Sequence, residues 1–131
     1  MSGSDACLQL DVGNGSTKWR LVAAGNILAR GTYREDEPAT ERELLGAAPE
    51  PARIWVASVA APGREAALRA LLASRWNLEP WFARSVSAAC GLRNSYAEPE
   101  RLGVDRWLAM LGARERVAGR LCVVDAGSAL T

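Results

Sequence analysis

The chain has 131 residues, with 16 Lys or Arg against 15 Asp or Glu and a formal net charge of +1. This balance argues against a dedicated nucleic-acid binder, which usually carries a basic excess. No stretch is apolar enough for a membrane span, and the polar N-terminus lacks a signal-peptide layout. We therefore expect a cytoplasmic protein. The sequence contains no histidine, which excludes Ser-His-Asp triads, Cys-His dyads and His-ligated zinc within the chain.

The first third of the chain predicts three consecutive strands. Residues 7–11 alternate and lead into the turn Gly13-Asn14-Gly15-Ser16. A second strand is expected over residues 18–24 and, after a Gly25-Asn26 turn signal, a third over residues 27–33. Their order predicts an antiparallel meander.

Helices and strands are expected to alternate after the meander. They are a short helix over residues 40–45, a buried strand over 54–59, a helix over 64–76 and a short strand over 80–83. Thr40 is expected to cap the first helix, with Glu43 completing a capping box. A meander followed by alternating elements predicts an α/β fold with a mixed sheet and flanking helices.

The last part of the chain predicts a polar connection over residues 85–102, a helix over 103–118 and a final buried strand over 121–125. Cys7 and Cys122 lie in apolar runs and are expected to be reduced core residues, whereas Cys90 stays undecided. The chain stops shortly after the final strand, so we expect a partial chain.

The first candidate site is the segment Asp11 to Lys18. Its small residues permit close approach of a phosphate, and main-chain amides in such a turn can point inward to bind it. Lys18 supplies a cation, and Asp11 is a candidate Mg²⁺ ligand. The alternative is a plain β-hairpin with an Asn14-Gly15 turn; the segment is not a P-loop, because the GxxxxGK[ST] order is absent.

A second acidic turn begins at Asp125 and continues through Gly127 and Ser128. Two such turns, each after a predicted strand, suggest paired acidic loops facing a common cleft. The alternative is that both are ordinary strand exits.

The third candidate site is the pair Asp105 and Arg106 at the start of a predicted helix. An acidic residue there is favoured by the helix dipole, which offers a purely structural explanation for Asp105. Arg106 is unfavourable on the same argument, so a bidentate grip on a substrate carboxylate is the expected purpose. Asp105 would then accept a proton from a substrate hydroxyl.

Three stretches together, LDVGNGSTKW, RNSYAEPERLGVDRWLAMLGA and CVVDAGSALT, resemble in order and spacing the N-terminal half of type III pantothenate kinases, a family that includes the Bvg accessory factor proteins. The resemblance implies a ribonuclease H-like domain of the actin-like ATPase superfamily, with the family's second domain outside this sequence. It also implies ATP-dependent phosphorylation of pantothenate, the first step of coenzyme A biosynthesis, by a homodimer.

The resemblance assigns roles to individual residues. ATP phosphates would be bound by Asp11, Gly13, Asn14, Gly15, Ser16, Thr17, Lys18 and Ser128. Pantothenate would be contacted by Tyr96, Gly103, Val104, Asp105 and Arg106, with Asp105 as the catalytic proton acceptor. Asp125 would coordinate a monovalent cation, K⁺ or NH₄⁺, beside Mg-ATP.

Two other functions stay open at this point. One is a non-catalytic nucleotide-sensing or transcription-accessory module, and the other is a different kinase or phosphatase of the superfamily. The enzyme is favoured by the presence of Asp11, Lys18, Asp105, Arg106 and Asp125 together, because a module that merely binds partners has no need of a base beside the arginine. Ser128 stands where the family more often has Thr, and Gly15 loosens the first loop.

Overall fold

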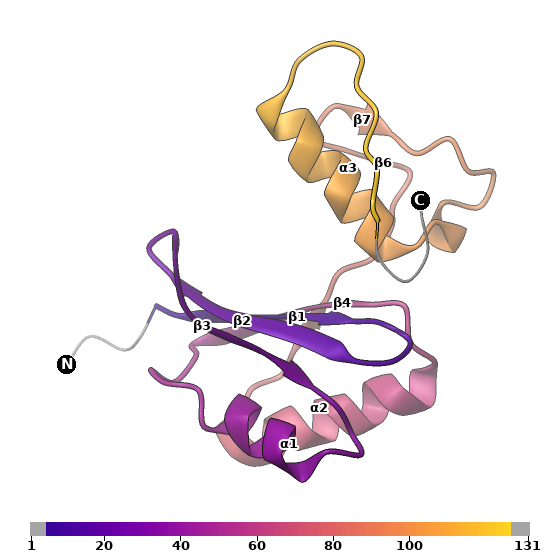
Figure 1. Cartoon of the computed structure of the whole chain (residues 1–131). Helices are drawn as coiled ribbons and strands as arrows, with labels where there is room; N and C mark the ends of the chain where they lie inside the picture. Colours follow the sequence, from indigo (N-terminus) through magenta and orange to yellow (C-terminus); the bar gives the residue numbers. More distant parts are fainter. Residues whose placement is uncertain (1–4, 127–131) are drawn as a thin grey trace. The chain divides into compact units, whose positions relative to one another are not determined.

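The computed structural model describes residues 5–126, which form two compact units with their boundary between residues 83 and 84. The first unit is built on a five-stranded sheet (Figure 1). In their order across the sheet, its strands are β3 (Asn26–Tyr33), β2 (Thr17–Ala23), β1 (Cys7–Val12), β4 (Arg53–Ser58) and β5 (Trp81–Phe82). The second unit contains a small hairpin and one longer helix.

The meander forms as predicted, from β1 (Cys7–Val12), β2 (Thr17–Ala23) and β3 (Asn26–Tyr33). Both pairings are antiparallel. The turn between β2 and β3 is Ala24-Gly25, one residue earlier than predicted. Both turn residues have positive φ, 49° and 77°, which is the backbone of the two-residue turns that match strand twist.

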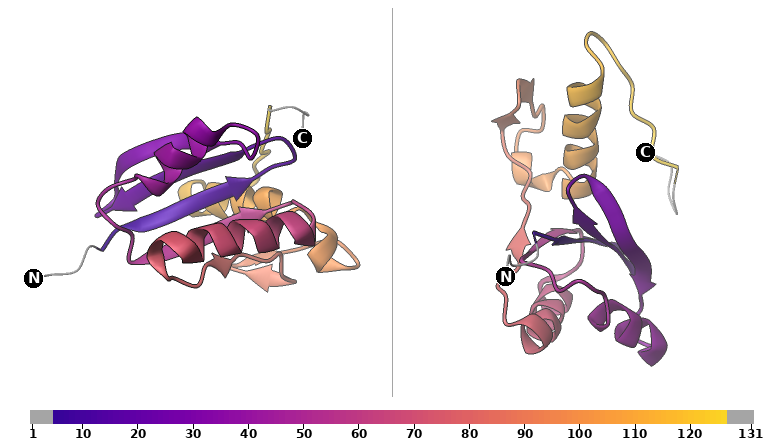
Figure 2. Two further views of the ribbon diagram at one scale, coloured as in Figure 1. Left: turned by 90° about the horizontal axis from the view of Figure 1, so that it is seen from below. Right: turned by 90° about the vertical axis from the view of Figure 1, so that its left-hand side faces the viewer.

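Helices α1 (Pro38–Leu45) and α2 (Pro62–Trp76) lie on the same side of the sheet (Figures 1 and 2). Strand β4 (Arg53–Ser58) runs parallel to β1, and the short β5 (Trp81–Phe82) runs parallel to β4. The prediction of a mixed sheet with flanking helices is therefore confirmed.

The capping box predicted around Thr40 is wrong. Helix α1 begins two residues before Thr40, with Pro at its first position and Glu37 as its N-cap residue. Proline favours that first position, because its fixed φ suits the helix and the N–H it lacks has no partner there. The Thr40 hydroxyl instead accepts a hydrogen bond from the Arg34 N–H (2.9 Å) and contacts the Glu37 carbonyl oxygen (2.7 Å).

The core of the first unit lies between the sheet and the two helices. Strand side chains alternate between faces, so one face of the sheet is apolar, and the helices cover it with residues at helical spacing. The fully buried members include Leu8, Leu21, Leu44, Ile54, Val56 and Leu72. The opposite face is more polar, with exposed Trp55 and Trp81 in an edge-to-face pair whose ring centroids are 6.2 Å apart.

Residues 85–102, predicted as a polar connection, contain regular secondary structure in the second unit. Strands β6 (Ala88–Ala89) and β7 (Leu92–Arg93) form a hairpin whose turn, Cys90-Gly91, has φ values of 51° and 75°. A short 3₁₀ helix, η1 (Pro99–Arg101), precedes α3 (Val104–Arg116). Val104 and Trp107 on α3 are buried, whereas Leu108 is exposed.

The strand predicted over residues 121–125 is wrong. No strand is assigned there, and Cys122 and Val124 are exposed. A strand requires hydrogen-bonded neighbours, and no described strand pairs with this segment. Cys122 is thus not the core residue predicted, whereas Cys7 is buried as expected. No helix within residues 5–126 is long and apolar enough to cross a membrane.

Candidate functional site

The first candidate site is the loop between β1 and β2. Asp11 and Lys18 are partners across the antiparallel ladder, as are Val12 and Thr17, and four residues, 13–16, connect the strands. The Gly13 N–H donates to the Ser16 carbonyl oxygen at 3.0 Å and closes the loop. Directly opposed residues point to the same face of a sheet, so Asp11 and Lys18 lie together on the exposed face.

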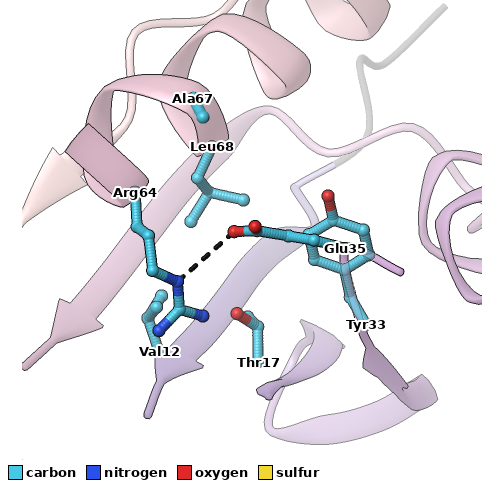
Figure 3. Close-up of a pocket in the computed structure, with 7 residues that line it drawn as sticks. All are labelled: Val12, Thr17, Tyr33, Glu35, Arg64, Ala67 and Leu68. Carbon is cyan, nitrogen blue, oxygen red and sulfur yellow. Dashed lines mark hydrogen bonds and ion pairs between the residues drawn. The ribbon is translucent and has the colours of Figure 1, made fainter. Parts of the chain in front are cut away.

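Thr17 lies on the other face of the sheet. It is 3% exposed, and with Val12 it lines a cavity of about 240 Å³ between the sheet and α2 (Figure 3). The remaining lining residues are Tyr33, Glu35, Arg64, Ala67 and Leu68. A contribution of Thr17 to phosphate binding on the Lys18 face would therefore come from its main chain.

Arg64 is a residue of this site that the sequence interpretation missed. Its Nη1 donates to the carbonyl oxygens of Gly13 (2.8 Å) and Asn14 (3.1 Å), and its Nε pairs with Glu35 Oε1 at 3.3 Å (Figure 3). The signal was present, because Arg64 is a cation in the first turn of α2, where the helix dipole disfavours positive charge. The same argument had been applied to Arg106.

Burial raises the pKa of two groups in the first unit. It raises the pKa of the Tyr33 phenol above its ordinary value, and the carboxylates of Glu41 and Glu35 add to that rise. Burial also raises the pKa of the Cys7 thiol. Both side chains are therefore held in their neutral forms, and neither is an activated nucleophile.

The second candidate site is the start of α3. No side chain caps this helix from Gly103, and Asp105 Oδ1 accepts a hydrogen bond from the Arg106 N–H at 2.9 Å. Asp105 thus has a structural role at the helix start, as the alternative interpretation anticipated. The Arg106 side chain is exposed, and within residues 5–126 the structure records no ion pair for it.

Asn94 organises the segment that leads to α3, and the sequence interpretation assigned it no role. It is 7% exposed, and its Nδ2 donates to the carbonyl oxygens of Val86 (3.2 Å) and Pro99 (3.1 Å). Its Oδ1 accepts from the Tyr96 N–H at 3.0 Å. The main chain of Tyr96 is therefore held while its side chain is 45% exposed.

The structure places the predicted residues in two groups. Asp11 to Lys18 form one loop of the first unit, while Tyr96 and the segment Gly103 to Arg106 belong to the second unit. Whether the groups meet, and whether the two acidic turns share a cleft, stays a prediction. Asp125 is exposed, and Ser128 lies outside the described residues. Within residues 5–126, no three potential metal ligands among His, Cys, Asp and Glu cluster together.

Comparison with known proteins matches residues 7–131 to the family model of type III pantothenate kinase. Similar curated proteins, each named type III pantothenate kinase, come from Halorhodospira halophila (37% identical, covering 95% of this chain and 52% of the relative), Methylobacillus flagellatus (42%, 95% and 48%) and Burkholderia pseudomallei (35%, 98% and 49%). The chain spans about half the length of these relatives.

Proposed function

Since the chain belongs to the type III pantothenate kinase family, we propose that it serves the ATP-dependent phosphorylation of pantothenate, the first step of coenzyme A biosynthesis. The observation that carries the proposal is the Asp11–Lys18 hairpin, in which a carboxylate and an ammonium flank a four-residue loop on one face of the sheet. We further propose a ribonuclease H-like fold of the actin-like ATPase superfamily, acting as a cytoplasmic homodimer.

The β1–β2 loop would bind the ATP phosphates. Phosphoryl transfer depends on positioning and charge neutralisation more than on covalent chemistry. The Lys18 ammonium would neutralise phosphate charge, and the main-chain N–H groups of residues 13–17 would donate to phosphate oxygens. Ser128 is proposed as a further ATP contact on the resemblance alone.

The residues present fit a magnesium ion held mainly by the nucleotide. Mg²⁺ in kinases is usually bound by one or two carboxylates, waters and substrate phosphates, and Asp11 offers one exposed carboxylate beside the loop. When bound, the ion would neutralise charge on the transferring phosphate. Asp125 is proposed as a carboxylate ligand of K⁺ or NH₄⁺, which would add a further positive charge.

The start of α3 would bind and activate pantothenate. Arg106 is exposed, and its guanidinium would take the pantothenate carboxylate in a bidentate grip, with Tyr96, Gly103 and Val104 alongside. Asp105 Oδ1 accepts from the Arg106 main chain, which orients the carboxylate and leaves Oδ2 to accept the proton of the primary hydroxyl. General-base help of this kind contributes roughly 10²–10⁴-fold.

A coupled ADP-release assay in K⁺ buffer, with and without pantothenate, tests the proposal. We expect Asp105→Asn to lower kcat by about 10²–10⁴-fold. Glu100→Gln is the matched control, because it makes the same carboxylate-to-amide change at an exposed residue of η1, and we expect it to keep wild-type turnover. Arg106→Ala should chiefly raise the KM for pantothenate.

Wild-type turnover by Asp105→Asn would refute the proposed base, and an unchanged KM in Arg106→Ala would refute the carboxylate grip. If this polypeptide shows no pantothenate-dependent turnover, the same variants are measured in a chain extended past Thr131. Absence of pantothenate-dependent turnover there too would refute the kinase assignment.

A further inference from the structure

Arg64 joins two parts of the first unit that are far apart in the sequence. It is the third residue of α2, yet its Nη1 donates to two successive carbonyl oxygens of the β1–β2 loop, those of Gly13 at 2.8 Å and Asn14 at 3.1 Å. The residues lie 51 and 50 positions apart in the chain. Glu35 Oε1 pairs with Nε on the other edge of the guanidinium, at 3.3 Å.

The position of Arg64 is unfavourable for helix formation alone. The first turn of a helix carries partial positive charge, so cations are stabilising at the opposite end. Arg64 is also partly withdrawn from solvent, with its side chain 31% exposed. Its contacts with loop carbonyls and with Glu35 supply the negative partners that offset this placement.

The two hydrogen bonds determine which way the loop amides point. In a trans peptide the C=O and the following N–H lie on opposite sides of the chain. Because Arg64 holds the carbonyl oxygens of Gly13 and Asn14 toward α2, the N–H groups of Asn14 and Gly15 are turned away from the guanidinium. These are amide donors of the loop that the proposed function assigns to ATP phosphates.

We propose that Arg64 is a positioning residue that orders the β1–β2 loop and aims its amides at the phosphates. The proposal rests on the proposed function only for the identity of the ligand. Asn14 and Gly15 are exposed, and a Cβ at Gly15 would meet no other atom within 4 Å. Packing therefore does little to restrain these residues, and Arg64 adds a restraint to the hydrogen bond between the Gly13 N–H and the Ser16 carbonyl oxygen.

The test compares Arg64→Met with Arg75→Met. Methionine keeps an unbranched apolar stem and removes the donors. Arg75 is a matched control on the same helix, because it also donates to a main-chain carbonyl oxygen, that of Leu45 at 2.9 Å, and contacts a carboxylate, Glu50 Oε1 at 3.4 Å. It makes no contact with the loop.

The first readout is the ¹⁵N order parameter of the amides of residues 13–16. We expect rigid values of about 0.85 in the wild type and in Arg75→Met, and values below about 0.6 in Arg64→Met. Unchanged loop order in a folded Arg64→Met would overturn the proposal. Should that variant fail to fold, the rotation of the Arg64 guanidinium in the wild-type protein is measured instead. Restricted rotation of the Nη1 protons supports the positioning role of Arg64, and free rotation overturns it.

The second readout is Mg-ATP affinity by calorimetry. We expect Arg64→Met to raise Kd about 10- to 100-fold, since misplaced binding groups are costly, while Arg75→Met stays near the wild type. In the turnover assay, the KM for ATP should rise and that for pantothenate should not, a split that general destabilisation would not produce. A Kd for Mg-ATP in Arg64→Met equal to that of the wild type would overturn the role of Arg64 in phosphate binding. If the wild-type polypeptide binds no Mg-ATP, the affinities are measured in a chain extended past Thr131. Absence of Mg-ATP binding there too would overturn the proposed function, and the loop order parameters would then decide the positioning role of Arg64 by themselves.

Discussion

Asn94→Asp is a nearly isosteric change that removes two hydrogen-bond donors from the centre of the second unit. The native Nδ2 bridges the carbonyl oxygens of Val86 and Pro99, and Oδ1 accepts from the Tyr96 N–H. The substitution keeps the accepted bond and replaces the donating nitrogen with an oxygen. It therefore isolates what the bridge contributes to the segment leading into α3.

The magnitude follows from the bonds that are lost. Two neutral hydrogen bonds contribute roughly 1–3 kcal/mol in total, and the new carboxylate also faces two carbonyl oxygens at a site only 7% exposed. Because a buried polar group without a partner adds a further desolvation cost, we expect a total loss of about 2–4 kcal/mol near neutral pH. Burial raises the pKa of a carboxyl group, so acidification should protonate the new side chain, restore one donor and recover part of the stability.

Hydrogen exchange of the α3 amides measures this loss, because it reports the opening free energy of the second unit separately from the first. Asn77→Asp is the matched control: Asn77 is exposed, and its left-handed backbone, φ 53°, tolerates Asp. A loss below about 0.5 kcal/mol in Asn94→Asp, or an equal loss in the control, would refute the assigned role of the Nδ2 bridge.

Three further outcomes are expected. Gly31→Ala should lower the free energy of unfolding by about 1–3 kcal/mol in urea titration, because its Cβ would lie 2.8 Å from the buried Trp19 ring; an unchanged midpoint would contradict this. Burial raises the pKa of Tyr33, so the contribution of this pKa shift to stability is complete below about pH 10 and is lost as pH rises through the folded-state pKa. Tyr33→Phe should therefore flatten the decline in urea midpoint above about pH 10. An equally steep decline in the variant would refute this effect of Tyr33. Thr17→Val should leave Mg-ATP affinity within about twofold while Lys18→Ala weakens it, since only Lys18 lies on the exposed face; equal losses in calorimetry would contradict that division.

Much of the fold could be predicted from local patterns. Alternating strands, turn residues and helical leucine spacing indicated β1 to β5 and the helices α1, α2 and α3 within a few residues, because these signals act between near neighbours. Two of the errors were also local in origin. At Thr40, the proline at the first helical position decided where α1 begins, and at Ala24-Gly25 the required positive φ values fell one residue earlier than the composition indicated.

The segment 121–125 shows the limit of such patterns. Its apolar run resembles a buried strand, but a strand exists only when another strand supplies hydrogen bonds, and none of the described strands pairs with it. The predicted burial of Cys122 was wrong for the same reason. Cys7 has an equally short apolar context, yet it belongs to a strand that pairs with both β2 and β4, and it is buried.

The sequence by itself identified the family and named the candidate residues for its chemistry, the Asp11–Lys18 loop and the Asp105-Arg106 pair. Only the tertiary structure decided how those residues are held. Thr17 turns toward the cavity because the strand register places it opposite Val12, and Arg64 holds the loop from a helix 51 positions away. Asn94 likewise donates hydrogen bonds to the carbonyl oxygens of Val86 and Pro99, which lie 8 and 5 positions from it in the chain. Such contacts join residues that have no local relation along the chain, and the folded backbone alone brings them within hydrogen-bond distance.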